Sequence, residues 1–86
     1  MKVIRASFIP TAGHGYLMVP CQDVHVVGFE PSPYSTSDAM NYFLEEDCDA
    51  GAFIVEAQRE GFTVEVSEAR QDSVMDDYID YVFENA

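Results

Sequence analysis

Basic residues are what this 86-residue sequence has least of: four lysines and arginines stand against sixteen aspartates and glutamates, for a net charge of −12. So few cations leave little to hold the phosphates of a nucleic acid or of an anionic membrane surface. No apolar run comes near the roughly 18 residues that a membrane-spanning helix needs. We therefore expect that the protein binds neither nucleic acid directly nor a membrane.

Cysteine is also scarce. Cys21 and Cys48 are the two thiols, and the N-terminal stretch has neither the sustained apolar segment nor the cleavage site of a secretory signal. Thiols in a chain without such a signal are usually kept reduced. The expected location is the cytoplasm, with both cysteines unpaired.

What the sequence does hold is enough apolar material for a core. Hydrophobic residues make up 48% of the chain and aromatic residues 13%, which argues against a disordered chain despite the high charge. The length suits one small domain, spanning residues 1–86. We expect its stability to be modest, because a chain of this size buries only about 60–65% of the surface that its unfolded state exposes.

The charge is distributed unevenly along the chain. Residues 1–43 carry two bases and three acids, whereas residues 44–86 carry thirteen acids against Arg59 and Arg70, a net charge of −11. A mild excess of acid serves solubility. An excess as one-sided as this one favours attraction to a basic surface.

Four segments are rich in β-branched and aromatic residues and are expected to form strands. In the last of them Phe62, Val64 and Val66 alternate with polar residues and should point inward. The four predicted strands are 3–9, 16–19, 40–44 and 62–68.

Two connecting segments follow from proline and glycine. Residues 30–39 contain two prolines and three serines, which is typical of a loop. The stretch 21–27 allows two interpretations. Its alternating valines suit a strand, whereas Pro20 before it and Gly28 after it suit one or two helical turns.

Two segments have helical spacing of apolar residues. The first covers about 49–60 and ends before Gly61, and the second covers 74–83 near the C-terminus. The expected fold class is therefore α+β. A small antiparallel sheet of three to four strands packs against one central helix, with an amphipathic C-terminal helix docked nearby.

Three quoted stretches carry a family resemblance: "TAGHGYLMVP", "PYS" and "YFLEEDCDAGAF". Together they resemble a family of small proteins and domains of unknown function that occurs on phages, plasmids and mobile elements. Phe43 departs from the family pattern by standing between Tyr42 and Leu44. The resemblance covers roughly residues 8–68 and implies a mobile-element origin, where small acidic proteins often block host defence. The matching residues are Thr11, Gly13, His14, Gly15, Tyr16, Leu17, Val19, Pro20, Tyr34, Ser35 and Tyr42 through Phe53.

The stretch "EEDCD" places four acids, Glu45, Glu46, Asp47 and Asp49, at the start of the central helix. Acids there accept hydrogen bonds from free backbone N–H groups and suit the helix dipole. We expect Asp47 or Asp49 to be the capping residue. One acid is enough for a cap, so the surplus favours a cation or a basic partner. Neighbouring anions raise the pKa of the Cys48 thiol, which argues against thiol catalysis.

His14, between two glycines, could act as a general base or hold a metal together with Cys48 and the acids of 45–49. No paired ligand spacing supports this, and an EF-hand pattern is absent. The alternative is that His14 holds the loop between the first two strands by hydrogen bonding. We expect no metal, no cofactor and no catalytic residue.

The C-terminal stretch "DDYIDYVFE" is the third candidate. Asp76, Asp80 and Glu84 recur every four residues and so form one stripe on a helix, with Tyr78 and Tyr81 beside it. Such a stripe is either a solvated helix face or an interaction surface in which tyrosines are anchors and acids match lysine or arginine.

The favoured hypothesis is a small acidic binding protein that is not an enzyme. It would act in the host-cell cytoplasm by occupying the basic surface of a nucleic-acid-binding defence protein, partly as a nucleic-acid mimic of the anti-CRISPR or anti-restriction kind. The alternatives are a ligand- or metal-binding domain centred on His14 and the 45–49 acids, and a self-associating protein that forms a homodimer through its C-terminal helix. The predicted contact residues are Glu45, Glu46, Asp47, Asp49, Asp76, Asp77, Tyr78, Asp80, Tyr81 and Glu84.

Overall fold

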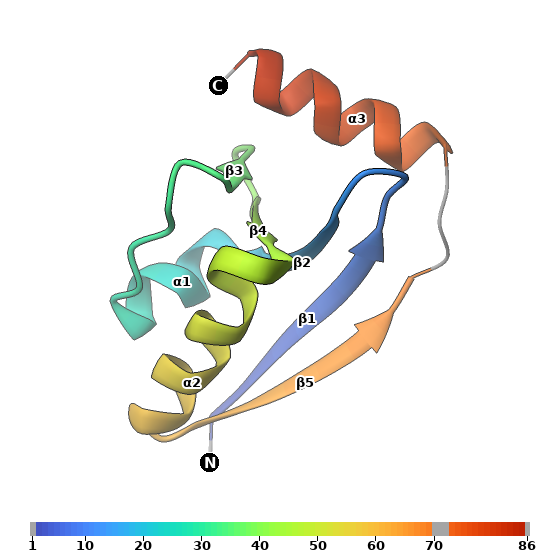
Figure 1. Cartoon of the computed structure of the whole chain (residues 1–86). Coiled ribbons are helices and arrows are strands. Elements are labelled where there is room, and N and C mark those ends of the chain that lie inside the picture. Colours follow the sequence, from blue (N-terminus) through green and yellow to red (C-terminus); the bar gives the residue numbers. More distant parts are fainter. Residues whose placement is uncertain (1, 70–72, 86) are drawn as a thin grey trace.

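The computed structural model describes residues 2–69 and 73–85 and has α+β architecture, with a sheet flanked by helices (Figure 1). The predicted C-terminal helix at 74–83 is confirmed. The predicted loop at 30–39 contains a short strand. In chain order the elements are β1 (Lys2–Pro10), β2 (Gly15–Pro20), α1 (Cys21–Val27), β3 (Thr36–Ser37), β4 (Asn41–Glu45), η1 (Glu46–Ala50), α2 (Gly51–Arg59), β5 (Phe62–Glu68) and α3 (Ser73–Glu84).

The sheet has five strands in the order β3-β4-β2-β1-β5 and is mixed rather than antiparallel. β2 runs antiparallel to β1 and to β4, whereas β5 runs parallel to β1. The prediction of an antiparallel sheet of three to four strands was wrong on both counts. A helix between β4 and β5 returns the chain to the same end of the sheet, so β5 must run in the same direction as β4 and β1.

Proline and glycine mark the helix ends. The open question at 21–27 is settled as the helix α1, which starts after Pro20 and ends at Gly28, whose φ of 79° is the left-handed conformation that glycine favours. The predicted central helix comprises η1, a single π-helical turn, followed directly by α2. Gly61, with φ of 90°, makes the turn into β5.

Alternation along the strands gives the sheet two apolar faces. One face packs against α1 and α2, which lie side by side in Figure 1, and its core includes Leu17, Leu44 and Phe53. On the other face α3 covers the part near the β1–β2 hairpin, where Ile79 packs against Ile9, Tyr16 and Phe43, and the part around Arg5 and Glu65 is open. The C-terminal helix is therefore part of the fold, and not a free arm.

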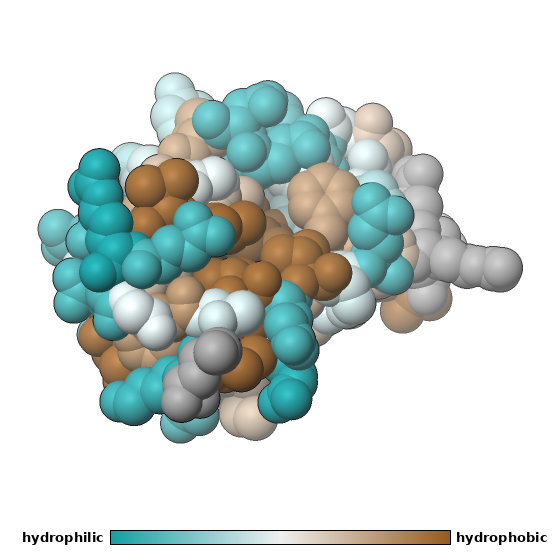
Figure 2. Space-filling view, turned by 90° about the horizontal axis from the view of Figure 1, so that it is seen from below, coloured by the Kyte–Doolittle hydropathy of each residue, from teal (hydrophilic) through white to brown (hydrophobic). Residues whose placement is uncertain are grey.

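The helix-covered core reaches the surface at the end where the chain begins and α2 turns into β5. Figure 2 views this end and shows apolar atoms gathered at its centre with polar groups around them. Phe62 and Val64 of β5 are partly buried against this core, as predicted. Val66 was predicted to point inward with them, but it is 48% exposed and, unlike Phe62 and Val64, is not packed against this core.

Candidate functional site

Glu45 caps the helix that follows β4. Its side chain accepts a hydrogen bond from the backbone N–H of Asp47, and only 6% of its surface is exposed. The prediction that Asp47 or Asp49 is the cap was therefore wrong. The π-helical turn begins at Glu46, earlier than expected, so the capping position falls on the last residue of β4.

Asp49 of η1 ties the 30–38 loop to the turn that leads into α2. Its Oδ2 accepts hydrogen bonds from the backbone N–H of Ser32 at 3.0 Å, from the Ser32 hydroxyl at 2.8 Å, and from the Ser35 hydroxyl. Ser35 Oγ in turn accepts a hydrogen bond from the N–H of Glu45 at 2.9 Å. With 4% of its surface exposed, Asp49 is buried, and its carboxylate holds the loop from inside the domain.

Glu46 joins the helix start to the β1–β2 hairpin. Its Oε1 accepts a hydrogen bond from the N–H of Gly15 at 3.1 Å. A Cβ at Gly15 would lie 2.2 Å from the ring of Phe8 and 2.7 Å from Glu46 Oε2, so glycine is required for this close approach. The hairpin is closed by hydrogen bonds between Thr11 and the backbone of His14.

The side chain of His14 is exposed and lies edge-on to Tyr16, with ring centroids 6.5 Å apart. It is therefore the backbone of this residue that holds the loop. Among the residues that the structure describes, no group of three or more histidine, cysteine or acidic side chains is placed to hold a metal ion.

Glu46, Asp47 and Cys48 are the exposed members of the segment 45–49. Partial desolvation, followed by the nearby carboxylates with Glu45 first among them, raises the pKa of the Cys48 thiol. The thiol is thus less ionised than a free cysteine at neutral pH, which weakens it as a nucleophile.

Tyr78 docks α3 on the domain. Its hydroxyl donates a hydrogen bond to Asp38 Oδ2, and its ring lies edge-on to Phe43 at 6.2 Å between centroids. Because Asp38 is the acceptor, the pKa of Tyr78 is raised. Tyr78 still exposes 40% of its surface, whereas Tyr81 exposes 60%. Tyr81 is the freer of the two predicted anchors.

The predicted stripe on α3 is not uniform. Asp76 is half-buried where α3 faces the hairpin, and it lines a hollow of about 120 Å³ with Thr11, Tyr16 and Asp80. Asp80 and Glu84 are exposed, as is Asp77 beside them. The stripe therefore starts against the domain and becomes solvent-facing toward the end of the helix.

Tyr16 is where the two acidic segments meet. It pairs with Glu45 across β2 and β4, and its ring packs on Phe83 of α3 at 5.8 Å between centroids. Burial, followed by the charges of Glu45 and Asp80, raises the pKa of the Tyr16 hydroxyl. The fold thus brings Glu45 of β4 and Asp80 of α3 close enough to one buried tyrosine for both charges to act on its hydroxyl.

Sequence reasoning missed the serines that bind Asp49. The only available signal was the concentration of serines in the 30–39 loop, which was attributed to turn formation alone. Likewise, nothing in the sequence indicated that Asp38 would accept a hydrogen bond from a tyrosine forty residues away.

No protein-family model, curated protein or solved structure matches the chain. Within the described residues, no helix is long and apolar enough to cross a membrane.

Proposed function

We propose that this protein is a non-enzymatic, acidic binding protein that occupies the basic surface of a nucleic-acid-binding host defence protein. One observation carries the proposal: Glu46 accepts a hydrogen bond from the hairpin at Gly15, Asp76 and Asp80 of α3 line a hollow beside the same hairpin, and no ion pair among the described residues neutralises these acids. The ion pairs among the described residues, Arg5–Glu65 and Arg59–Glu56, lie elsewhere in the fold.

The proposed mechanism is competition for cationic sites. The exposed carboxylates would occupy lysines and arginines that otherwise hold phosphates, and the partner would lose its nucleic acid. Tyr81 would supply the apolar contact that slows dissociation, because exposed tyrosines are frequent anchors at the centre of interfaces. The solvent-facing acids available for this role are Glu46, Asp47, Asp77, Asp80 and Glu84.

The resemblance to proteins of phages and mobile elements supplies the setting, a host cytoplasm in which a defence protein is the target. The buried Glu45 and Asp49 drop out of the proposed contact surface, because their oxygens are hydrogen-bonded inside the domain. Asp76 and Tyr78 stay in the proposed contact surface, at the side where α3 meets the rest of the domain.

Pull-down from a host lysate tests the proposal with two variants of equal charge. The first, Asp77→Asn with Asp80→Asn and Glu84→Gln, neutralises the exposed side of α3. The second, Asp23→Asn with Glu30→Gln and Glu60→Gln, removes the same charge elsewhere. We expect the first to lose the captured protein and the second to keep it, with capture falling steeply as salt rises.

Added DNA or RNA should also compete with the wild-type protein for whatever is captured. Capture that is insensitive to salt, that survives neutralisation of α3, or that persists when the partner carries nucleic acid would contradict the proposal.

A further inference from the structure

A small hollow lies between the strand β3 and the C-terminal half of α3, which are neighbours in Figure 1. Its volume of about 160 Å³ is below the roughly 300–1,000 Å³ of pockets that hold drug-sized molecules. A single side chain of another protein therefore suits this hollow better than a small-molecule ligand does. The lining residues are Ser37, Asp38, Tyr78, Tyr81, Val82 and Asn85.

Asp38 is the one charged residue in this lining. Its Oδ1 accepts hydrogen bonds from the backbone N–H groups of Met40 at 2.8 Å and of Asn41 at 2.7 Å, and its Oδ2 accepts one from the Tyr78 hydroxyl. Burial alone would raise the pKa of Asp38, but these hydrogen bonds lower it overall, so the carboxylate is ionised at neutral pH. Because all three donors are neutral, they fix the position of the negative charge without cancelling it.

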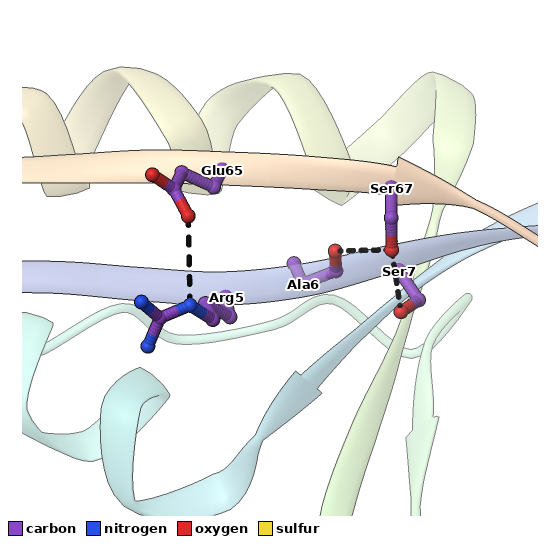
Figure 3. Close-up of polar contacts among 5 residues, drawn as sticks. All are labelled: Arg5, Ala6, Ser7, Glu65 and Ser67. Atoms are coloured by element: carbon purple, nitrogen blue, oxygen red, sulfur yellow. Dashed lines mark hydrogen bonds and ion pairs between the residues drawn. The ribbon is translucent and has the colours of Figure 1, made fainter.

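The larger hollow on the open part of the sheet differs in this respect. Figure 3 shows Glu65 of β5 reaching toward Arg5 of β1, with Nε and Oε1 3.5 Å apart. The acid there already has a basic neighbour from its own chain. Among the residues that the structure describes, no basic side chain forms an ion pair with Asp38. A cation from another protein would therefore meet an unpaired carboxylate only in the hollow beside α3.

Two tyrosines supply the aromatic part of this hollow. Tyr78 is fixed by its hydrogen bond to Asp38 and by its edge-on contact with Phe43, and it exposes 40% of its surface. Tyr81, one turn further along α3, exposes 60%. The hollow thus presents accessible aromatic rings next to a fixed negative charge.

This combination suits an arginine side chain. A cation over the face of a tyrosine ring is attracted by the ring, and arginine takes this position more often than lysine does. The guanidinium group is planar, weakly hydrated and able to stack on aromatic rings, whereas the ammonium group of lysine is compact and strongly hydrated. The Tyr78 hydroxyl donates its proton to Asp38, so its oxygen is left to accept a hydrogen bond from one of the five N–H groups of a guanidinium.

We propose that this hollow receives an arginine side chain from the basic surface of the partner protein, with the guanidinium group against Tyr81 and its charge toward Asp38. The proposal rests on the proposed function for the source of that arginine. It adds one specific contact to the acids of α3, and Asp38 contributes to it from outside the acidic half of the chain. A second copy of the chain is a poor source, because it has four bases against sixteen acids.

NMR titration of the full chain with short synthetic peptides tests the proposal. The probe is a glycine–serine peptide with one central arginine, compared with the same peptide carrying lysine or citrulline in its place. Citrulline keeps the planar end of arginine and removes its charge. We expect the arginine peptide to shift the ring signals of Tyr78 and Tyr81 and the amide signals of Ser37 and Asp38. The lysine peptide should bind more weakly, and the citrulline peptide should cause no shift.

Matched variants locate the contact. Tyr81→Ala should weaken binding of the arginine peptide about 2- to 5-fold, from the loss of a cation–π contact at an exposed site, whereas Tyr81→Phe keeps the ring and the affinity. Tyr34→Ala removes a tyrosine of comparable exposure, 66%, from another part of the surface and should leave the affinity unchanged.

Asp38→Asn should weaken binding of the arginine peptide by up to about 5-fold, as for other exposed ion pairs. Its control is Glu30→Gln, which removes an exposed acid outside the hollow. Because Asp38 also holds α3 through Tyr78, the Tyr81 variants test the contact independently of folding.

Equal binding of the arginine and citrulline peptides would overturn the inference, as would stronger binding of the lysine peptide or no binding at millimolar concentration. Shifts confined to residues outside the hollow, or an affinity that Tyr81→Ala leaves unchanged, would do the same. None of these results bears on the lysate experiment with Asp77, Asp80 and Glu84, so the two proposals fail separately.

Discussion

The segment 45–49 and the helix α3 are both strongly acidic, yet the fold uses their acids differently. Glu45 and Asp49 are buried and accept hydrogen bonds from backbone amides and serine hydroxyls. Asp77, Asp80 and Glu84 face solvent. The difference teaches that acidic density alone does not mark an interaction surface. Whether an acid is buried in the fold or left on the surface depends on whether N–H and O–H donors lie within hydrogen-bonding distance of its carboxylate.

Removal of Asp49 should have the largest effect. Asp49→Ala leaves the donors of Ser32 and Ser35 without their acceptor inside the domain. We expect a loss of about 1.5–3 kcal/mol in the free energy of unfolding, the range for hydrogen bonds to a charged group. Urea denaturation measures it.

The control for Asp49 is Asp47→Ala, which removes an exposed acid two residues away and should change stability by no more than about 0.5 kcal/mol. Equal losses in the two variants would show that the comparison between buried and exposed acids is mistaken.

Removal of the cap should have the next largest effect. Glu45→Ala frees the N–H of Asp47 at the start of η1, and loss of a capping side chain costs about 0.5–2 kcal/mol. The same denaturation experiment, compared with Glu46→Ala, tests it. Because Glu46 bonds only the hairpin amide of Gly15 and is exposed, we expect its removal to cost less.

Changing Asp38, which α3 contacts through Tyr78, should have a smaller effect, on the pKa of one side chain. Asp38→Asn replaces the charged acceptor of the Tyr78 hydroxyl, so the pKa of Tyr78 should fall toward its ordinary value of about 10. Titration by NMR measures this change. The pKa of Tyr16, which is raised by burial, Glu45 and Asp80, is the internal control and should not move.

The same variant should alter the response of stability to acid. Burial alone would raise the pKa of Asp38, but hydrogen bonds from Tyr78 and from the amides of Asn41 and Met40 lower it overall. A lowered pKa stabilises the fold above about pH 4, and this contribution is lost as pH falls through the folded-state pKa. The stability difference between wild type and Asp38→Asn should therefore shrink below about pH 4.

Neutralising the exposed side of α3 should have the smallest effect on folding. Asp77→Asn with Asp80→Asn and Glu84→Gln changes side chains that are exposed and that make no hydrogen bond within the described part of the chain, so the free energy of unfolding should change by less than about 0.5 kcal/mol per site. Thermal denaturation measures it. A large loss would mean that these acids, like those of 45–49, belong to the fold.

Much of the secondary structure could be predicted because it is local. Alternation at 62–68, helical spacing at 74–83 and glycine at position 61 each depend on neighbours in the sequence. The parallel pairing of β5 with β1 could not be predicted, because it depends on where the chain returns after α2. The candidate site, too, could be predicted in part from the sequence. The acids were found by composition, whereas the burial of Asp49 depends on Ser32 and Ser35, which the sequence places in a separate loop.

The crossover from β4 through α2 to β5 also has a consequence for the order of folding. β1 and β2 are joined by a short hairpin, whereas Ser7 and Ser67, which meet across β1 and β5, lie 60 positions apart. Closing so long a loop costs more chain entropy than closing the hairpin, and contacts of this separation slow folding. We expect the hairpin to form early and β5 to join last, carrying α3 with it. Until then β1 would itself be the edge of an incomplete sheet, and this intermediate would be the species most prone to pair with a second chain.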